Sequence, residues 1–226
     1  MRTGMGRSHP PPTYSPANIP STSGWQTPLL RALVSRTALL FFFRLCRGRV
    51  VDQADVGALQ GGFIIVANHV SYLDWILLWG WFRYHHGIRL TFLAKERLFH
   101  HWFWGRLVTP SCCVRVTDDG QNLASLSDYR LLKQARHIAI FPEGTRSRDG
   151  QIGPFKPGAA QIALRLRLPI LPVALNGFYA AWPAGRALPH PSPCEIAIGS
   201  SIEPRQDENE HTLTERIRQA VIELSH

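Results

Sequence analysis

The sequence contains few cysteines, and their spacing indicates neither a disulfide framework nor a zinc site. Four cysteines occur in 226 residues, with no Cys-x-x-Cys pair and no histidine at zinc-finger spacing. A domain of this length buries a sizeable core without such cross-links. Cys112 and Cys113 lie in a strand-like run and are interpreted as small core residues. A reducing compartment is therefore favoured.

Long hydrophobic runs are also absent. A membrane-spanning helix needs roughly 20 consecutive apolar residues, whereas the longest uncharged run in the leucine-rich stretch near the N-terminus is residues 37–43. The first 20 residues carry five prolines and no apolar core, which is not the pattern of a secretory signal. Residues 1–27 are predicted to form a disordered, proline-rich arm.

Acidic residues are outnumbered by basic ones. Asp and Glu total 16 against 25 Lys and Arg, so the net charge is +9 with His neutral, and the isoelectric point is near 10.0. At 45% hydrophobic residues the chain is too apolar for a disordered protein, which predicts a basic globular protein. Nucleic acid and an anionic membrane surface both attract such a protein. Because no helix-turn-helix, zinc-finger or RNA-binding signature is present, the membrane is favoured; a non-enzymatic basic protein that binds nucleic acid or membrane is the alternative.

A basic segment rich in leucine and phenylalanine occupies residues 28–50. Its apolar residues are interrupted by Arg31, Arg36, Arg44, Arg47 and Arg49. This pattern predicts an amphipathic helix that lies in the membrane interface with its arginines toward the headgroups. A helix packed on the core of its own domain shows the same pattern, so both interpretations stay open.

Short β-rich runs alternate with helical patterns from residue 51 onward. Strands are predicted at residues 61–67, 90–94, 111–116, 138–141, 170–175 and 195–198. Helices are predicted after Ser71, over residues 158–167, and after a capping box formed by Thr212 and Glu215. The alternation predicts an α/β fold with a mixed, largely parallel sheet flanked by helices. Residues 51–226 are predicted to form one domain that follows the N-terminal amphipathic helical segment.

A histidine and an aspartate follow the first predicted strand. His69 comes just after this strand and beside a helix start, which is where α/β folds place reactive groups. Asp74, five residues on, can reach back across the first turn, hold the imidazole in one tautomer and stabilise the imidazolium. The alternative is that Asp74 serves only the helix end, through backbone N–H groups and the helix dipole.

A turn rich in hydroxyl and guanidinium groups follows the strand predicted at 138–141. Residues 141–148 read Phe-Pro-Glu-Gly-Thr-Arg-Ser-Arg. Arg146 is suited to grip a phosphate with two N–H groups, and successive backbone N–H groups can form an anion-binding nest. Lys156, just before the helix predicted from residue 158, is a candidate auxiliary phosphate contact. An ordinary solvated turn is the alternative.

Taken together, the two motifs resemble those of the glycerolipid acyltransferase family, with its bacterial lysophosphatidic acid acyltransferases as the closest type. Asn-His-x4-Asp at residues 68–74 is followed about seventy residues later by Phe-Pro-Glu-Gly-Thr-Arg-Ser. Residues 109–115 and 168–173 correspond to the second and fourth blocks of the family. The second block departs from the family pattern Gly-x-Ile-Phe-Ile-Asp-Arg, because Thr109 and Val114 replace its Gly and Asp.

The resemblance implies roles for individual residues. His69 is expected to act as general base on the acceptor hydroxyl, with Asp74 orienting the imidazole and stabilising its charge. The acceptor phosphate site is expected to comprise Arg115, Glu143, Gly144, Thr145 and Arg146. A thioester already has a good leaving group, so a base that activates the alcohol suffices, and no covalent acyl-enzyme is expected.

The implied protein is a membrane-associated O-acyltransferase at the cytoplasmic face. It would move a fatty acyl group from acyl-CoA or acyl carrier protein to the hydroxyl of 1-acylglycerol 3-phosphate, giving phosphatidic acid, without a metal or a bound redox cofactor. Because the second block departs from the family, other acceptors stay open: glycerol 3-phosphate, another lysophospholipid or a lyso-aminolipid. Five of the seven tryptophans fall between residues 75 and 104 among arginines, a mixture typical of a membrane–water interface. No oligomeric state is predicted.

Overall fold

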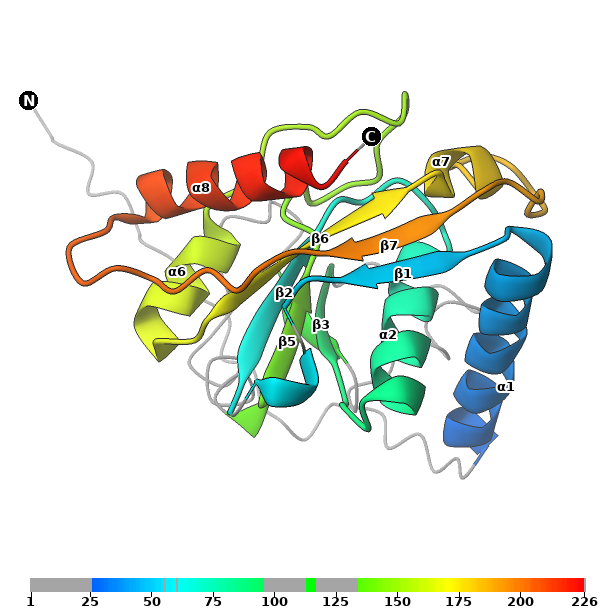
Figure 1. The fold of residues 1–226 in the computed structure, drawn as a ribbon, viewed down its shortest axis with the longest axis horizontal. Coiled ribbons are helices and arrows are strands. Elements are labelled where there is room, and N and C mark those ends of the chain that lie inside the picture. Colours follow the sequence, from blue (N-terminus) through cyan, green and yellow to red (C-terminus); the bar gives the residue numbers. More distant parts are fainter. Residues whose placement is uncertain (1–25, 55, 60, 96–112, 117–133, 226) are drawn as a thin grey trace, which may run out of the picture.

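The architecture is built on a mixed β-sheet. A computed structural model describes residues 26–54, 56–59, 61–95, 113–116 and 134–225. Within these residues the strand order is β1-β7-β6-β2-β5-β3-β4, and neighbouring strands are parallel except for β6 and β7 (Figure 1). The strands are β1 (Arg49–Asp52), β2 (Phe63–Ala67), β3 (Thr91–Lys95), β4 (Cys113–Val116), β5 (His137–Ile140), β6 (Ile170–Asn176) and β7 (Glu195–Ile198).

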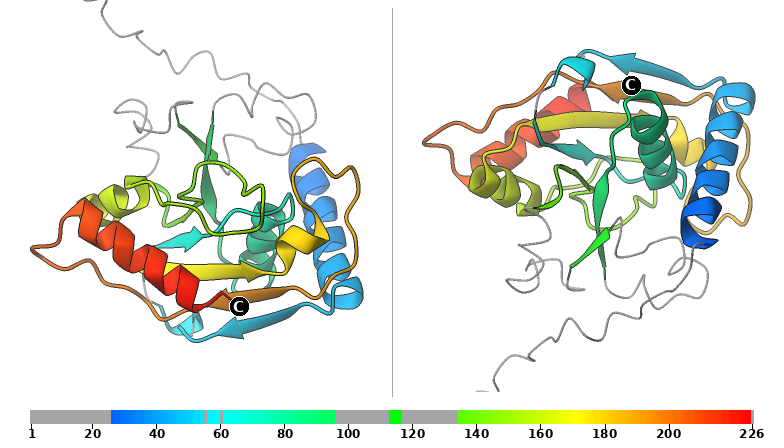
Figure 2. Two further views of the ribbon diagram at one scale, coloured as in Figure 1. Left: turned by 90° about the horizontal axis from the view of Figure 1, so that it is seen from above. Right: turned by 90° about the horizontal axis from the view of Figure 1, so that it is seen from below.

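Helices cover both faces of the sheet. On one face α1 (Gln26–Leu40) lies beside α2 (Asp74–His85), and on the other α6 (Gly158–Leu166) lies beside α8 (Glu210–Glu223) (Figures 1 and 2). A short helix, α7 (Phe178–Ala181), follows β6, and a single 3-10 turn covers Val56–Ala58. The predicted α/β fold, with a largely parallel sheet flanked by helices and an N-terminal helix, is confirmed.

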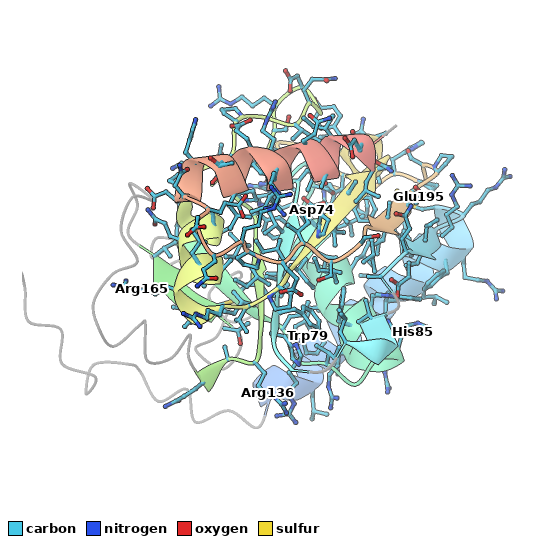
Figure 3. The ribbon with its side chains drawn as sticks, turned by 60° about the vertical axis from the view of Figure 1, so that its left-hand side comes forward. Asp74, Trp79, His85, Arg136, Arg165 and Glu195 are labelled. Carbon is cyan, nitrogen blue, oxygen red and sulfur yellow. The ribbon has the colours of Figure 1, made fainter. Side chains whose placement is uncertain are left out.

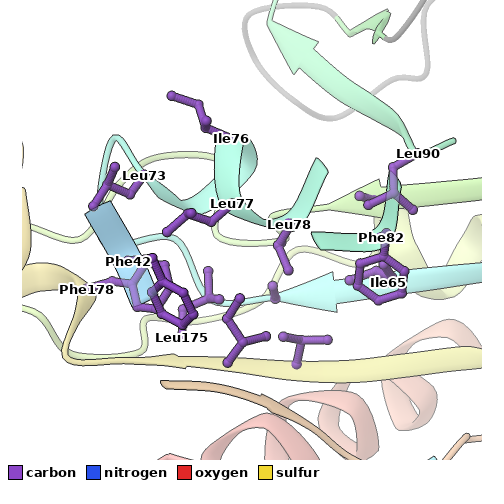
Figure 4. Close-up of a cluster of buried hydrophobic side chains, with 14 of the residues drawn as sticks. Phe42, Ile65, Leu73, Ile76, Leu77, Leu78, Phe82, Leu90, Leu175 and Phe178 are labelled. Atoms are coloured by element: carbon purple, nitrogen blue, oxygen red, sulfur yellow. The ribbon is translucent and has the colours of Figure 1, made fainter. Parts of the chain in front are cut away.

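The central strand β2 shows how the core is divided. Phe63, Ile65 and Ala67 pack toward α1 and α2, whereas Ile64 and Val66 pack toward α6 and α8. Side chains alternate along a strand, so a strand covered on both faces needs an unbroken apolar run, which is what this strand has. Figure 4 shows the cluster on the α2 side.

The N-terminal segment is helical over a shorter range than the predicted 28–50. After α1 ends at Leu40, a π-helical turn covers Phe41–Leu45, and residues 49–50 belong to β1, a strand that the sequence patterns do not predict. β1 pairs with β7 and is only four residues long, with three of its side chains exposed. It therefore lacks the apolar run that marks the buried strands.

One face of α1 packs on the domain. Ala38 and Leu39 are buried, as is Phe42 in the turn that follows. A Cβ added at Gly80 of α2 would lie 3.0 Å from Leu39 Cδ1, so the absence of a side chain at Gly80 permits this close approach. The face of α1 that carries Ala38 and Leu39 therefore packs on the core of its own domain, as one of the two interpretations expects.

Some predicted features lie outside the described residues. These are most of the proline-rich arm at 1–27, the tryptophans at 102 and 104, and the greater part of the second block at 109–115. Of that block, the structure describes the part that forms β4.

The start of α8 differs from the predicted capping box. Asn209 is the N-cap: its Oδ1 accepts hydrogen bonds from the backbone N–H of Thr212 at 2.9 Å and from the Thr212 hydroxyl at 3.1 Å. The predicted box of Thr212 and Glu215 is wrong because Asn209, itself a strong capping residue, has the extended backbone that the cap position requires.

We expect Asn209→Ala to lower the free energy of unfolding by about 1 kcal/mol, because the N–H of Thr212 loses its acceptor. Chemical denaturation of the full chain measures this change. Thr212→Val removes only the hydroxyl and serves as the matched control, which should be less destabilising. A larger loss for Thr212→Val would contradict the assignment of the cap.

Candidate active site

The two sequence motifs meet at one edge of the sheet. β2 and β5 are parallel neighbours with Val66 paired to Ile140, so the residues that follow them emerge side by side at the carboxyl ends of the strands. The backbone N–H of Ser147 donates to the carbonyl oxygen of His69 at 2.7 Å. The loop at residues 141–148 is thereby attached directly to the histidine that the first motif carries.

His69 and Asp74 form a hydrogen-bonded pair. His69 Nδ1 lies 2.8 Å from Asp74 Oδ2; the Asp74 side chain is fully buried, while 20% of the His69 side chain is exposed. A carboxylate can only accept in this contact, so Nδ1 carries the proton and Nε2 of the neutral imidazole keeps its lone pair. The pair is arranged to accept a proton at Nε2.

The same carboxylate oxygen also organises the turn before α2. Asp74 Oδ2 accepts from the backbone N–H groups of Val70 at 2.7 Å and Ser71 at 2.8 Å, in addition to His69. Asp74 lies at one end of α2 and His85 at the other (Figure 3), so the carboxylate sits at the positive end of the helix dipole. Serving the helix end and holding the imidazole are therefore one arrangement rather than alternatives.

Hydrogen bonds to β6 and to the residue after α7 anchor the segment from Asn68 to Tyr72. Asn68 Oδ1 accepts from the backbone N–H of Leu175 in β6 at 2.8 Å. The carbonyl oxygen of Trp182 accepts from the Ser71 hydroxyl at 2.8 Å and from the Tyr72 backbone N–H at 3.2 Å. Both ends of the segment that carries His69 are thus tied to the β6–α7 region.

The imidazole ring is held in its plane as well. The ring of Phe141 stacks on His69 with 4.3 Å between centroids and an interplanar angle of 18°. Phe92 of β3 stacks on Phe141 in turn, at 6.1 Å and 21°. Since Asp74 sets the direction of the ring and Phe141 sets its plane, His69 has little rotational freedom.

Glu143 is a second titratable group at this edge. Its pKa is raised to about 7, chiefly by burial and in part by the nearby Asp74 and Asp149, although hydrogen bonds from the backbone N–H groups of His69 and Gly153 act in the opposite direction. Its Oε1 is buried and has no hydrogen-bond partner among the described residues. The sequence motif identified Glu143, but only the fold explains its raised pKa.

Lys156 lies over the turn at Gly144. The backbone of Gly144 has φ +70°, and a Cβ added there would lie 3.3 Å from the Cε and Nζ atoms of Lys156. The backbone N–H of Lys156 donates to the carbonyl oxygen of Pro142 at 3.0 Å. Glycine is suited to this position for its conformation and for the room it leaves, and the fold brings Lys156 to the loop. Thr145, on the same loop, is exposed.

The two arginines of the predicted site are placed differently. The guanidinium carbon of Arg146 lies 3.7 Å from the ring centroid of Tyr72. Arg115 lies in β4, paired with Ala94 of β3, and β3 separates this strand from β5. Arg146 therefore lies beside the turn from His69 to Asp74. The side chain of Arg115 is not among those that the structure describes.

The motifs did not identify Tyr72 and Trp182 as parts of the site. Tyr72 lies within the first motif, between His69 and Asp74, but its contact with Arg146 is made only in the folded chain and gives no local signal. Trp182 follows α7 far along the chain and carries no local signal, because its role depends on a backbone carbonyl placed by the fold.

Chemically, the site combines a base with cationic groups. It can take a proton from a bound hydroxyl and hold an anion nearby, through His69, Arg146 and Lys156. In the part of the chain that the structure describes, no three His, Cys, Asp or Glu side chains are grouped closely enough to hold a metal ion.

Comparison with known proteins identifies the family. A family model with the description Acyltransferase matches residues 47–176, which is more than half of the chain and contains both motifs. The chain belongs to the acyltransferase family. The resemblance that the motifs indicate is confirmed.

Two relatives and one solved structure show how similar this chain is to individual proteins. A 1-acyl-sn-glycerol-3-phosphate acyltransferase of Cocos nucifera is 30% identical over 148 residues, 62% of this chain and 45% of that protein. A protein of the same name from Helicobacter pylori is 34% identical over 146 residues, 62% of this chain and 59% of that protein. The crystal structure of the 1-acyl-sn-glycerophosphate (LPA) acyltransferase PlsC from Thermotoga maritima matches with a TM-score of 0.68 and 25% identity, covering 88% of this chain and 79% of that one. The chain spans about half the length of the curated relatives it matches.

We expect Glu143 to make stability depend on pH. Because its native pKa of about 7 lies above the ordinary value, the native state binds more protons than the unfolded state between about pH 4.5 and 7, and the free energy of unfolding falls as pH rises through that window. Glu143→Gln stays neutral and should lose this contribution. Urea denaturation at pH 5 and pH 8 measures it, with Glu215→Gln on the exposed side of α8 as control. Parallel pH profiles for the wild type and Glu143→Gln would contradict the raised pKa.

Proposed function

We propose that the protein transfers a fatty acyl group from a thioester, acyl-CoA or acyl carrier protein, to the hydroxyl of 1-acylglycerol 3-phosphate, giving phosphatidic acid. The observation that carries the proposal is the buried Asp74 carboxylate holding His69 Nδ1 at 2.8 Å beside a loop that bears Arg146. Membership of the acyltransferase family, and the names of the relatives, support the same chemistry.

In the proposed reaction His69 acts as general base. Nε2 takes the proton from the acceptor hydroxyl while its oxygen attacks the carbonyl carbon of the thioester. The C–S bond then breaks, and the imidazolium returns the proton to the leaving thiolate, so that a free thiol and the new ester are formed. Asp74 stabilises the imidazolium in between, and no covalent acyl-enzyme is required.

The acceptor phosphate is assigned to the loop at residues 141–148. The guanidinium of Arg146 offers paired N–H donors that match a phosphate, and the Lys156 ammonium adds a second positive charge at Gly144. Glu143 stands at the same loop with its raised pKa, and in its protonated form it adds no negative charge against the phosphate. The loop thus supports an acceptor that carries a phosphate.

A transfer assay tests the proposal. We expect His69→Ala to lower turnover by at least about a hundredfold, the usual contribution of a general base, with the fold intact by circular dichroism. Asp74→Asn preserves the size of the side chain and removes the charge that stabilises the imidazolium, so it should lower both turnover and thermal stability. If Asp74→Asn lowered thermal stability alone, Asp74 would be only a helix-end residue.

The same assay measures which acceptor the protein prefers. Purified protein receives defined thioesters with 1-acylglycerol 3-phosphate, glycerol 3-phosphate, a zwitterionic lysophospholipid or a lyso-aminolipid, and the lipid products are identified by mass spectrometry. Fastest formation of phosphatidic acid is expected. Preference for a phosphate-free acceptor would remove the proposed role of Arg146.

Association with an anionic membrane, at the cytoplasmic face, is part of the proposal. The outward face of α1 exposes leucines that are 62–66% accessible, Leu29, Leu33 and Leu40, and the following turn exposes Phe43 and Leu45. Arg36 and Arg44 are exposed among them. Leucines flanked by arginines suit the boundary between acyl chains and anionic headgroups. Among the described residues no helix has the length and hydropathy to cross a bilayer.

We expect the double variant Leu33→Glu, Leu40→Glu to bind vesicles of mixed neutral and anionic phospholipid at least about tenfold more weakly, because two apolar contacts become charged. Co-flotation with vesicles measures this. The double variant His211→Glu, Gln219→Glu adds two acidic residues to the exposed side of α8 and is the matched control. An equal loss in both variants would show that net charge, and not the leucine face, governs binding.

A further inference from the structure

We propose that Tyr72 is a positioning residue for Arg146: its ring holds the guanidinium over one face and so presents the guanidinium N–H groups to the acceptor phosphate. The inference rests on the proposed function, in which Arg146 binds that phosphate. It adds a residue that the motif comparison did not assign.

The contact between the two side chains is close. The Arg146 guanidinium carbon stands 3.7 Å from the centroid of the Tyr72 ring, at stacking distance. Within the described part of the chain, no hydrogen-bond acceptor and no carboxylate pairs with the Arg146 guanidinium. A stacked guanidinium keeps its N–H groups in its own plane, where they point past the edge of the ring, and these donors are available to a planar or tetrahedral anion.

Tyr72 is itself fixed by the turn that orients the base. Its backbone N–H donates to the Trp182 carbonyl oxygen at 3.2 Å, and its ring packs against that of Trp182 with 5.3 Å between centroids. The preceding residue, Ser71, donates its N–H to Asp74 Oδ2 at 2.8 Å. The ring under Arg146 therefore belongs to the same rigid turn as the His69–Asp74 pair.

Arg146 is tied to the base on its other side as well. The next residue, Ser147, donates its N–H to the His69 carbonyl oxygen at 2.7 Å. The loop backbone and the guanidinium are thus both anchored to the segment from His69 to Asp74. This double attachment sets the distance between the phosphate-binding group and the base, which is the distance that an acceptor with its hydroxyl near its phosphate has to match.

Loss of the ring should affect acceptor binding and leave the base intact. Without the Tyr72 ring the guanidinium samples more orientations, so binding a phosphate costs more conformational entropy. Asp74 still accepts hydrogen bonds from the backbone N–H groups of Val70 and Ser71, so the turn that holds His69 is kept. From the usual strength of a cation–π contact, the KM for the phosphate-bearing acceptor should rise roughly three- to thirtyfold. The kcat and the KM for the thioester should change less than about twofold.

The experiment compares Tyr72→Leu and Tyr72→Met, which lack the ring, with Tyr72→Phe, which keeps it. Thermal melting establishes that each variant is folded, and Tyr72→Met keeps the test valid if Tyr72→Leu does not fold. Steady-state kinetics use 1-acylglycerol 3-phosphate and, as matched acceptor, 1-monoacylglycerol, which lacks the phosphate. We expect the KM for the phosphate acceptor to rise in the ringless variants alone, with wild-type values for Tyr72→Phe. An equal change with both acceptors, or a rise in the KM for the thioester, would overturn the inference.

Calorimetric titration with glycerol 3-phosphate separates this inference from the function on which it rests. We expect Arg146→Met to abolish binding and Tyr72→Leu to weaken it. Wild-type affinity in Tyr72→Leu, together with loss in Arg146→Met, would overturn the positioning role and leave the proposed acceptor standing. Unchanged affinity in Arg146→Met would instead refute the phosphate site.

Discussion

One carboxylate oxygen, Oδ2 of Asp74, holds together the part of the molecule on which the site depends. It accepts three hydrogen bonds, from His69 Nδ1 and from the backbone N–H groups of Val70 and Ser71. The Asp74 side chain has no exposed surface. Removing a carboxylate from water is unfavourable, and these donors together with the N-terminus of α2 offset that cost at Oδ2, while the buried Oδ1 has no hydrogen-bond partner among the described residues. The carboxylate that fixes the turn before α2 thus also sets the tautomer of the histidine.

The second constraint is the parallel pairing of β2 with β5. Two motifs about seventy residues apart reach the same edge because parallel neighbours end together, and the Val66–Ile140 register places them at matching heights. The sheet alone does not fix the side chains. That task falls to cross-contacts between the two segments: the stack of Phe141 on His69, the N–H of Ser147 on the His69 carbonyl, and Arg146 on Tyr72.

Sequence patterns predict the elements that carry the site better than the contacts that complete it. β2 and β5 are recognisable because a strand buried on both faces is continuously apolar and is bounded here by glycines or by Pro142. β1 escapes prediction because a short, mostly exposed edge strand has no such run. The sequence pattern places the cap of α8 three residues too far along the chain, at Thr212, because Asn209 and Thr212 are both good capping residues and only the backbone conformation separates them. The Trp182 carbonyl and the ring of Tyr72 act through tertiary contacts, which no local pattern encodes.

The packing of α1 connects its exposed leucine face to the candidate active site. α1 lies along α2 through Ala38 and Leu39, and Phe43 of the following turn approaches Trp81 of α2 with 5.9 Å between ring centroids. α2 begins at Asp74, so the helix that exposes leucines and arginines is packed against the helix whose first residue holds His69. A packed helix pair transmits position with little deformation, because protein interiors resist compression. Under the proposed function, lipid that holds the outward face of α1 therefore also sets the height of His69 above the bilayer, and a lipid acceptor anchored in the same bilayer by its acyl chain meets His69 at a defined depth.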